Sequence, residues 1–163
     1  MGSMRPAVIV FAATVLIAML PAAPIEASTG MPPEAKAVVS FARAQIGKPY
    51  KSLASGPSSY DCVGLTWRSF RVHELAATYI GGRRTPSGYY SWFANRGQIT
   101  RNPKPGDLVV WGKPPSHVGI YTGTKNGHPM AVSALVSGVK EHRVHGLTTA
   151  FRAYLRVAFN GRP

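Results

Sequence analysis

The stretch Leu108-Val109-Val110-Trp111 marks the point at which the pattern of this sequence changes from helices to strands. Upstream of it, apolar residues recur at helical spacing, and downstream of it short apolar runs alternate with turn residues. The later runs cover residues 117–122, 130–136, 139–144 and 155–159. Helices followed by a strand meander predict an α+β fold, with N-terminal helices packed on an antiparallel sheet of about five strands.

Three upstream segments have the spacing of helices. Residues 33–46 begin with a proline suited to a first helical turn and end at Gly47. Residues 62–76 repeat large apolar side chains, and residues 87–94 predict a short aromatic helix. The aromatic side chains of that helix are expected either to pack in the core or to form an exposed apolar patch.

The N-terminus has the features of a secretory signal peptide. Residues 6–25 are apolar except for Thr14, a short basic segment precedes them, and Ala27 is a small residue at a cleavage point. An uncleaved membrane anchor is the alternative. We therefore expect a signal peptide at residues 1–27 and a single domain at residues 28–163, with no membrane span after cleavage.

The chain contains one cysteine, Cys62, at the start of the second predicted helix. Exported proteins normally pair their cysteines, so a lone thiol indicates a nucleophile. The positive end of a helix dipole favours the reactive thiolate. His117, 55 residues later, is a candidate base, although a polar residue at a strand start is also an ordinary structural feature.

Four short motifs surround these two residues. They are Gly47-Lys48-Pro49-Tyr50, Asp61-Cys62-Val63-Gly64-Leu65, Pro105-Gly106-Asp107-Leu108-Val109 and Ser116-His117-Val118-Gly119-Ile120-Tyr121. In this order they resemble the motifs of the NlpC/P60 peptidases, over residues 35–157. The resemblance implies a papain-like fold and the hydrolysis of peptide bonds in bacterial cell-wall peptides, often next to a D-amino acid.

The resemblance also implies roles for individual residues. Cys62 becomes the nucleophile and His117 the base, while Tyr50 lies beside the nucleophile and contacts substrate. Asp61 either engages a free amino group of the stem peptide or caps the helix that follows it. Asp107 is expected to fix the turn before its strand.

The third polar residue, which orients the base, departs from the family pattern. Ser133 stands where the family often has histidine, and Val63 replaces the usual serine after the nucleophile. If the hairpin turns near Asn126, Ser133 pairs near Gly119, one step from His117 on the same face. The alternatives to Ser133 as orienter are His142 and His145.

The sequence thus predicts a secreted, wall-associated cysteine peptidase, monomeric, acting on peptidoglycan stem peptides. Its net charge of +13 predicts attraction to anionic cell-wall polymers, with a solvated surface that has no specific ligand as the alternative. No nucleic-acid module, metal-ligand spacing or nucleotide motif occurs, so we expect no specific nucleic acid, no metal and no cofactor. Two other functions remain open: a non-catalytic basic wall-binding protein with a degenerate site, and a papain-like toxin amidase or lipid acyl transferase.

Overall fold

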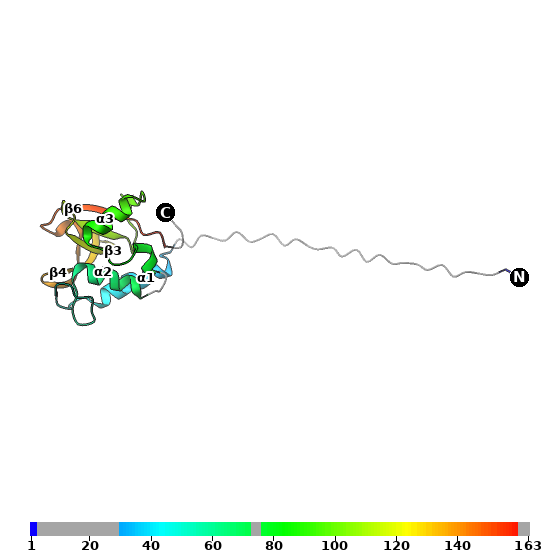
Figure 1. Cartoon of the computed structure of the whole chain (residues 1–163), viewed down its shortest axis with the longest axis horizontal. Coiled ribbons are helices and arrows are strands. Elements are labelled where there is room, and N and C mark those ends of the chain that lie inside the picture. Colours follow the sequence, from blue (N-terminus) through cyan, green and yellow to red (C-terminus); the bar gives the residue numbers. More distant parts are fainter. Residues whose placement is uncertain (3–29, 73–75, 160–163) are drawn as a thin grey trace.

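A computed structural model describes residues 1–2, 30–72 and 76–159, so the predicted signal peptide lies almost entirely outside the described residues. The helices are α1 (Pro33–Ala44), α2 (Cys62–Arg71) and α3 (Pro86–Ala94), with two short 3₁₀ helices, η1 (Ala76–Ile80) and η2 (Val144–Gly146). The strands are β1 (Ile99–Thr100), β2 (Leu108–Trp111), β3 (His117–Lys125), β4 (His128–Leu135), β5 (Gly138–Arg143) and β6 (Phe151–Leu155). Helices precede a strand meander, which confirms the predicted α+β class (Figure 1).

The described strands form one sheet of six, in the order β1-β6-β2-β3-β4-β5, and every neighbouring pair is antiparallel. The sequence predicted about five strands. The additional one is β1, whose two residues pair with the end of β6. Two residues are too few to show the alternation by which a strand is recognised.

The predicted last strand, at residues 155–159, is wrong. The sixth strand instead ends at Leu155, and the chain then leaves the sheet. Beyond it, Arg156 and Val157 both bind the carboxylate of Asp107. An apolar run alone does not reveal a competing buried polar partner, so the sequence placed the strand four residues too late.

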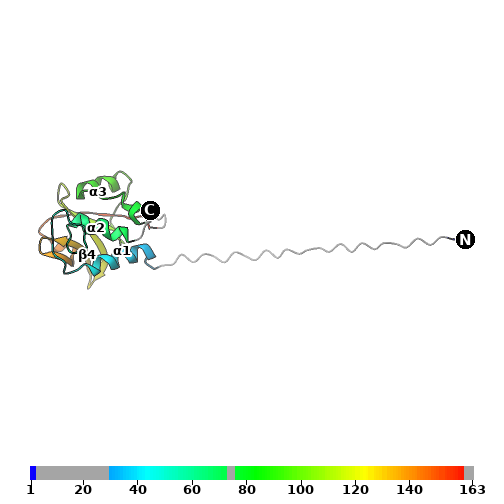
Figure 2. The same ribbon diagram turned by 60° about the horizontal axis from the view of Figure 1, so that its bottom comes forward.

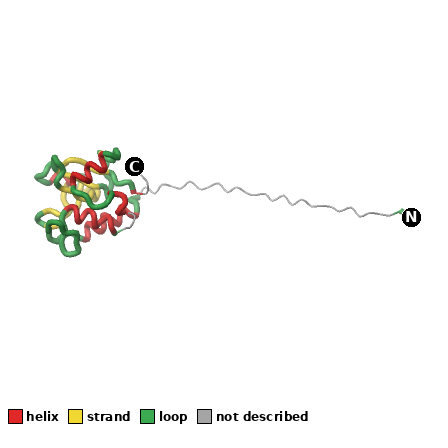
Figure 3. Tube along the Cα trace, in the orientation of Figure 1, coloured by secondary structure: helices red, strands yellow, loops and turns green. Residues whose placement is uncertain are grey.

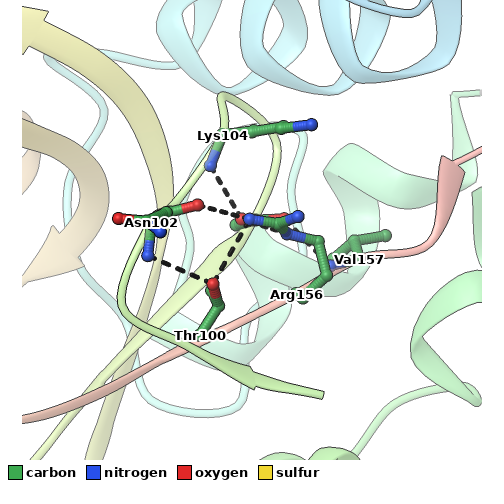
Figure 4. A network of polar contacts seen from close by, with 6 residues as sticks. Thr100, Asn102, Lys104, Arg156 and Val157 are labelled. Atoms are coloured by element: carbon green, nitrogen blue, oxygen red, sulfur yellow. Dashed lines mark hydrogen bonds and ion pairs between the residues drawn. The ribbon is translucent and has the colours of Figure 1, made fainter. Parts of the chain in front are cut away.

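Asp107 is the centre of a polar network at the start of β2, and Figure 4 labels its partners Lys104, Arg156 and Val157. Its carboxylate accepts hydrogen bonds from the backbone N–H of Lys104 at 2.8 Å and of Val157 at 2.9 Å, and from Arg156 Nε at 3.0 Å. Arg156 also donates to Thr100 Oγ1. Asp107 therefore fixes the turn before its strand, as predicted.

Apolar side chains fill both faces of the sheet. Neighbouring residues of β2 point to opposite faces, so Val110 belongs to the cluster under the helices and Trp111 to the cluster on the other face. Figures 1 and 3 show α1 and α2 side by side in the lower part of the domain and α3 apart from them in its upper part. Burial on both faces explains why β2 reads as a continuous apolar run.

The helices differ from prediction mainly at their ends. The second helix ends at Arg71, five residues earlier than predicted, and residues 73–75 lie outside the described part of the chain. In α3, which Figure 2 shows from another side, Tyr89 and Phe93 are fully buried. The predicted core packing is therefore confirmed for these two side chains.

Candidate active site

Two contacts set the start of α2, where Cys62 is the first residue. Asp61 is the N-cap, and its Oδ1 accepts a hydrogen bond from the backbone N–H of Gly64. Position 64 requires glycine, because a Cβ there would lie 1.9 Å from the carbonyl oxygen of Ala54. The first turn of α2 thus rests directly on the preceding loop, and this contact fixes the position of Cys62.

The segment before the helix is tied to it by backbone pairing. Tyr50 and Tyr60 form a parallel bridge, and the N–H of Tyr60 donates to Pro49 O at 3.1 Å. The bridge pairs Tyr50 with the residue that directly precedes Asp61 and Cys62. Its side chain is 36% exposed and reaches the same cleft as Cys62.

The cleft has a volume of about 320 Å³, within the range of small-ligand sites. Cys62, His117 and Tyr50 line it together, so the structure brings three of the sequence-predicted residues to one place. Asp61 and Ser133 do not line it. Ser116, from the same motif as His117, also lines the cleft. The remaining walls come from two segments to which the sequence assigned no role in the site, and they are Ala134, Leu135, Val136, Leu147, Thr148 and Thr149.

The electrostatic surroundings of Cys62 differ from the expectation based on its helix. Burial raises the pKa of the Cys62 thiol above its ordinary value, and the negative charge of Asp61 adds to this. Hydrogen bonds with the backbone of Val118, Val63 and Cys62 itself act in the opposite direction without overcoming the burial. The free protein therefore holds a thiol at this site.

His117 is hydrogen-bonded to Ser133. The pairing of Ile120 with Val132 puts Ser133 opposite Gly119, which confirms the predicted register. His117 Nε2 lies 2.9 Å from Ser133 Oγ, and the serine is fully buried. The close approach requires glycine at position 119, because a Cβ there would lie 2.9 Å from the Cβ of Ser133.

His142 contacts the same serine from the next strand. Its Nε2 lies 2.8 Å from Ser133 Oγ, and its Nδ1 lies 3.0 Å from the carbonyl oxygen of Arg143. The sequence offered Ser133, His142 and His145 as alternatives, and the structure joins the first two to His117. The ring of His145 instead packs edge-on against Phe151, with 4.9 Å between the centroids.

Trp111 is a residue of this site that the sequence did not indicate. Its ring lies 5.3 Å from that of His117 and 5.6 Å from that of His142, measured between centroids. Its Nε1 donates to Val144 O at 2.8 Å, which holds the indole in place. No sequence signal distinguishes it from the other apolar residues of β2.

Burial acts on both histidine rings in the same direction. It lowers the pKa of His117 to about 4, and the nearby His142 contributes to this. Burial also lowers the pKa of His142, against the hydrogen bond to Arg143 and the charge of Glu141. Cys62 and His117 are therefore a neutral thiol and a neutral imidazole at pH 7.

Among the described residues, no cluster of three histidine, cysteine or acidic side chains is arranged to hold a metal ion. In the same part of the chain, none of the helices combines the length and apolar character that crossing a membrane requires.

Comparison with known proteins points to one family. The model of the NlpC/P60 family matches residues 47–150. A protein from Listeria innocua described as "Probable endopeptidase p60" is 36% identical over 113 residues, which are 68% of this chain and 22% of that protein. The chain thus spans about a fifth of the length of this relative.

Solved structures of this family share the fold. The peptidoglycan hydrolase RipB from Mycobacterium tuberculosis matches with a TM-score of 0.54 and 24% identity, over 76% of this chain and 64% of that one. RipD from the same organism, described as a non-catalytic NlpC/p60 domain protein adapted to a peptidoglycan-binding function, matches with a TM-score of 0.56 and 18% identity, over 78% and 99% of the two chains. At these identities the likeness concerns the fold.

Proposed function

The chain belongs to the NlpC/P60 family, and we propose that it is a secreted cysteine peptidase that hydrolyses peptide bonds in bacterial peptidoglycan stem peptides. The observation that carries this proposal is the joint position of Cys62 and His117 in one cleft, with Ser133 hydrogen-bonded to the far side of the imidazole. This arrangement supplies a nucleophile, a base and a group that orients the base.

In the proposed reaction, His117 accepts the thiol proton as Cys62 Sγ attacks the carbonyl carbon of the scissile bond. The backbone N–H of Cys62, at the start of α2, donates to the oxygen that becomes negative. The C–N bond breaks when His117 passes the proton to the leaving amine, which leaves a thioester. Water, deprotonated by His117, then hydrolyses the thioester and restores the thiol.

The neutral resting pair has a consequence for this mechanism. Because burial disfavours both the thiolate and the imidazolium, the proton moves when substrate is bound and the attack begins. Tyr50, at the edge of the cleft, is the proposed substrate contact beside the nucleophile.

Asp61 as a binder of a free amino group stays a prediction. Its Oδ1 caps α2, and its Oδ2 lies 3.6 Å from Arg83 Nη2, so an incoming amine has to share a carboxylate that already has two partners. These contacts favour the capping role.

Export and wall association are part of the proposal. The signal-like residues 1–27 support secretion, and the net charge of +13 supports attraction to anionic wall polymers. Binding to isolated cell walls is expected to weaken as salt is raised, because such attraction is screened.

The test is mass spectrometry of a peptidoglycan digest made with the wild-type protein and with Cys62→Ala. We expect new stem-peptide fragments with the wild type only, and their masses identify the bond. Iodoacetamide provides a matched control, because Cys62 is the only thiol of the chain and its alkylation should abolish the same fragments. Equal digestion by wild type and Cys62→Ala would exclude a cysteine peptidase.

The other functions give different results in this experiment. A non-catalytic wall-binding protein would sediment with peptidoglycan and release no fragments from it. A lipid acyl transferase would leave the peptides intact and transfer an acyl chain from a phospholipid vesicle. The burial of Tyr89 and Phe93 removes two side chains from the aromatic patch that such a lipid substrate was expected to need.

A further inference from the structure

We propose that His142, acting through Ser133, fixes which ring nitrogen of His117 carries the proton, and thereby keeps the other nitrogen free to accept the thiol proton of Cys62. The inference deepens the proposed function and rests on it. It makes His142 a positioning residue on a strand that contributes nothing to the cleft wall.

The positions of the protons on the two rings can be assigned from the backbone carbonyl of Arg143. A carbonyl oxygen can only accept a hydrogen bond, so His142 Nδ1, at 3.0 Å, carries a proton and donates it. In a neutral imidazole the second nitrogen then has a lone pair and accepts. His142 Nε2 is therefore an acceptor, and it faces Ser133 Oγ at 2.8 Å.

The single hydroxyl proton of Ser133 then determines which nitrogen of His117 is protonated. Since His142 Nε2 accepts, the hydroxyl donates to it, and only the oxygen lone pairs remain for His117. His117 Nε2, at 2.9 Å, must then carry a proton and donate to Ser133 Oγ. This leaves His117 Nδ1 unprotonated, which is the state a base requires.

The surroundings allow little other hydrogen bonding at this serine. Ser133 is fully buried, and the fully buried ring of Trp111 packs against both histidine rings. The two hydrogen bonds of Ser133 therefore lie in a region of low dielectric constant, where each bond is strengthened and a missing partner is costly. Such surroundings favour a single arrangement of the protons over a mixture of arrangements.

Loss of His142 would remove the acceptor that directs the serine hydroxyl. The hydroxyl is then free to donate to His117 Nε2, which places the remaining ring proton on Nδ1 and blocks the base. Positioned proton transfer contributes about 10²–10⁴-fold to a rate, so we expect His142→Phe to lower kcat by about tenfold to a hundredfold with little change in KM. Phenylalanine keeps a ring against Trp111 and lacks the acceptor.

The first experiment measures the ring tautomer of His117 by ¹⁵N NMR at pH 7 without substrate. We expect the Nε2–H form in the wild type and in His128→Phe, which makes the same change at an exposed histidine of the β3–β4 hairpin. We expect the Nδ1–H form, or a mixture, in His142→Phe. An unchanged tautomer in His142→Phe overturns the inference, whether or not the protein cleaves peptidoglycan.

The second experiment is a double-mutant cycle on kcat with Ser133→Ala. Because the proposal has His142 set the proton of His117 through the serine, the double variant should be no slower than Ser133→Ala alone. His142→Gln should recover part of the activity, since its amide can both accept from Ser133 and donate to Arg143 O. Additive losses would refute the relay, and His142→Ala takes the place of His142→Phe if the latter does not fold.

Discussion

Lowering the pH from 7 to 4 is expected to destabilise the folded domain by about 3 kcal/mol through His117 alone. Burial, with His142 nearby, holds the pKa of His117 at about 4, against an ordinary value of 6.5. Between these values the unfolded chain binds a proton and the folded protein does not, so stability falls as the pH falls through 6.5. At 1.36 kcal/mol for each pH unit, the loss is about 2 kcal/mol at pH 5 and levels off near the folded pKa.

The assay is urea unfolding at pH 7, 6, 5 and 4, for the wild type and for His117→Gln. Glutamine does not titrate, so the free energy of unfolding of the variant should fall less, and the gap between the two curves should change by about 3 kcal/mol over the series. We compare how the free energy of unfolding changes with pH, because any effect of the substitution that does not depend on pH then cancels. His128→Gln, at an exposed histidine, should follow the wild type.

Parallel curves for the wild type and His117→Gln would refute the reasoning, because they would mean that His117 titrates alike in the folded and unfolded chains. A change of this size matters for a domain whose total stability is about 5–15 kcal/mol.

Three further predictions follow from single contacts. Gly119→Ala should cost about 1–3 kcal/mol in urea unfolding and also lower activity, because its Cβ would meet that of Ser133 at 2.9 Å; a variant that keeps both would contradict the close approach. Asp107→Asn should lower the free energy of unfolding by about 3–5 kcal/mol, since it breaks the buried ion pair with Arg156. Arg43→Gln, which breaks the exposed pair with Glu141, should lower it by less than about 1 kcal/mol. Equal losses in the two variants would contradict the difference in burial. The rate of Cys62 alkylation should rise with pH through a pKa above that of an unperturbed thiol, and a pKa below it would show that a thiolate is present at rest.

The last of these predictions changes how the site should be tested. The position of Cys62 at a helix start indicated a reactive thiolate, which would be alkylated rapidly even at mildly acidic pH. In the structure, burial outweighs the helix and raises the pKa of the thiol. Slow alkylation is therefore expected of an active enzyme too, and peptidoglycan digestion is the decisive measurement.

The α+β order and most elements were readable from the sequence, because the periodicity of apolar residues is a local signal. The strand β2 was predicted with its bounds, and the register that brings Ser133 opposite Gly119 followed from the hairpin turn alone. The last strand was misplaced because an apolar run does not reveal that Arg156 and Val157 bind Asp107, some fifty residues away in the chain.

The sequence by itself indicated the class of fold, the family motifs and the candidates Cys62 and His117, since each of these is carried by a short local pattern of residues. Only the tertiary structure showed that His142 joins Ser133 beside His117. Ser133 and His142 lie 16 and 25 residues after His117, and three neighbouring strands bring the three side chains together. The protonation of the site was likewise decided by burial, because the energy of a charge depends on how much water the folded chain leaves around it.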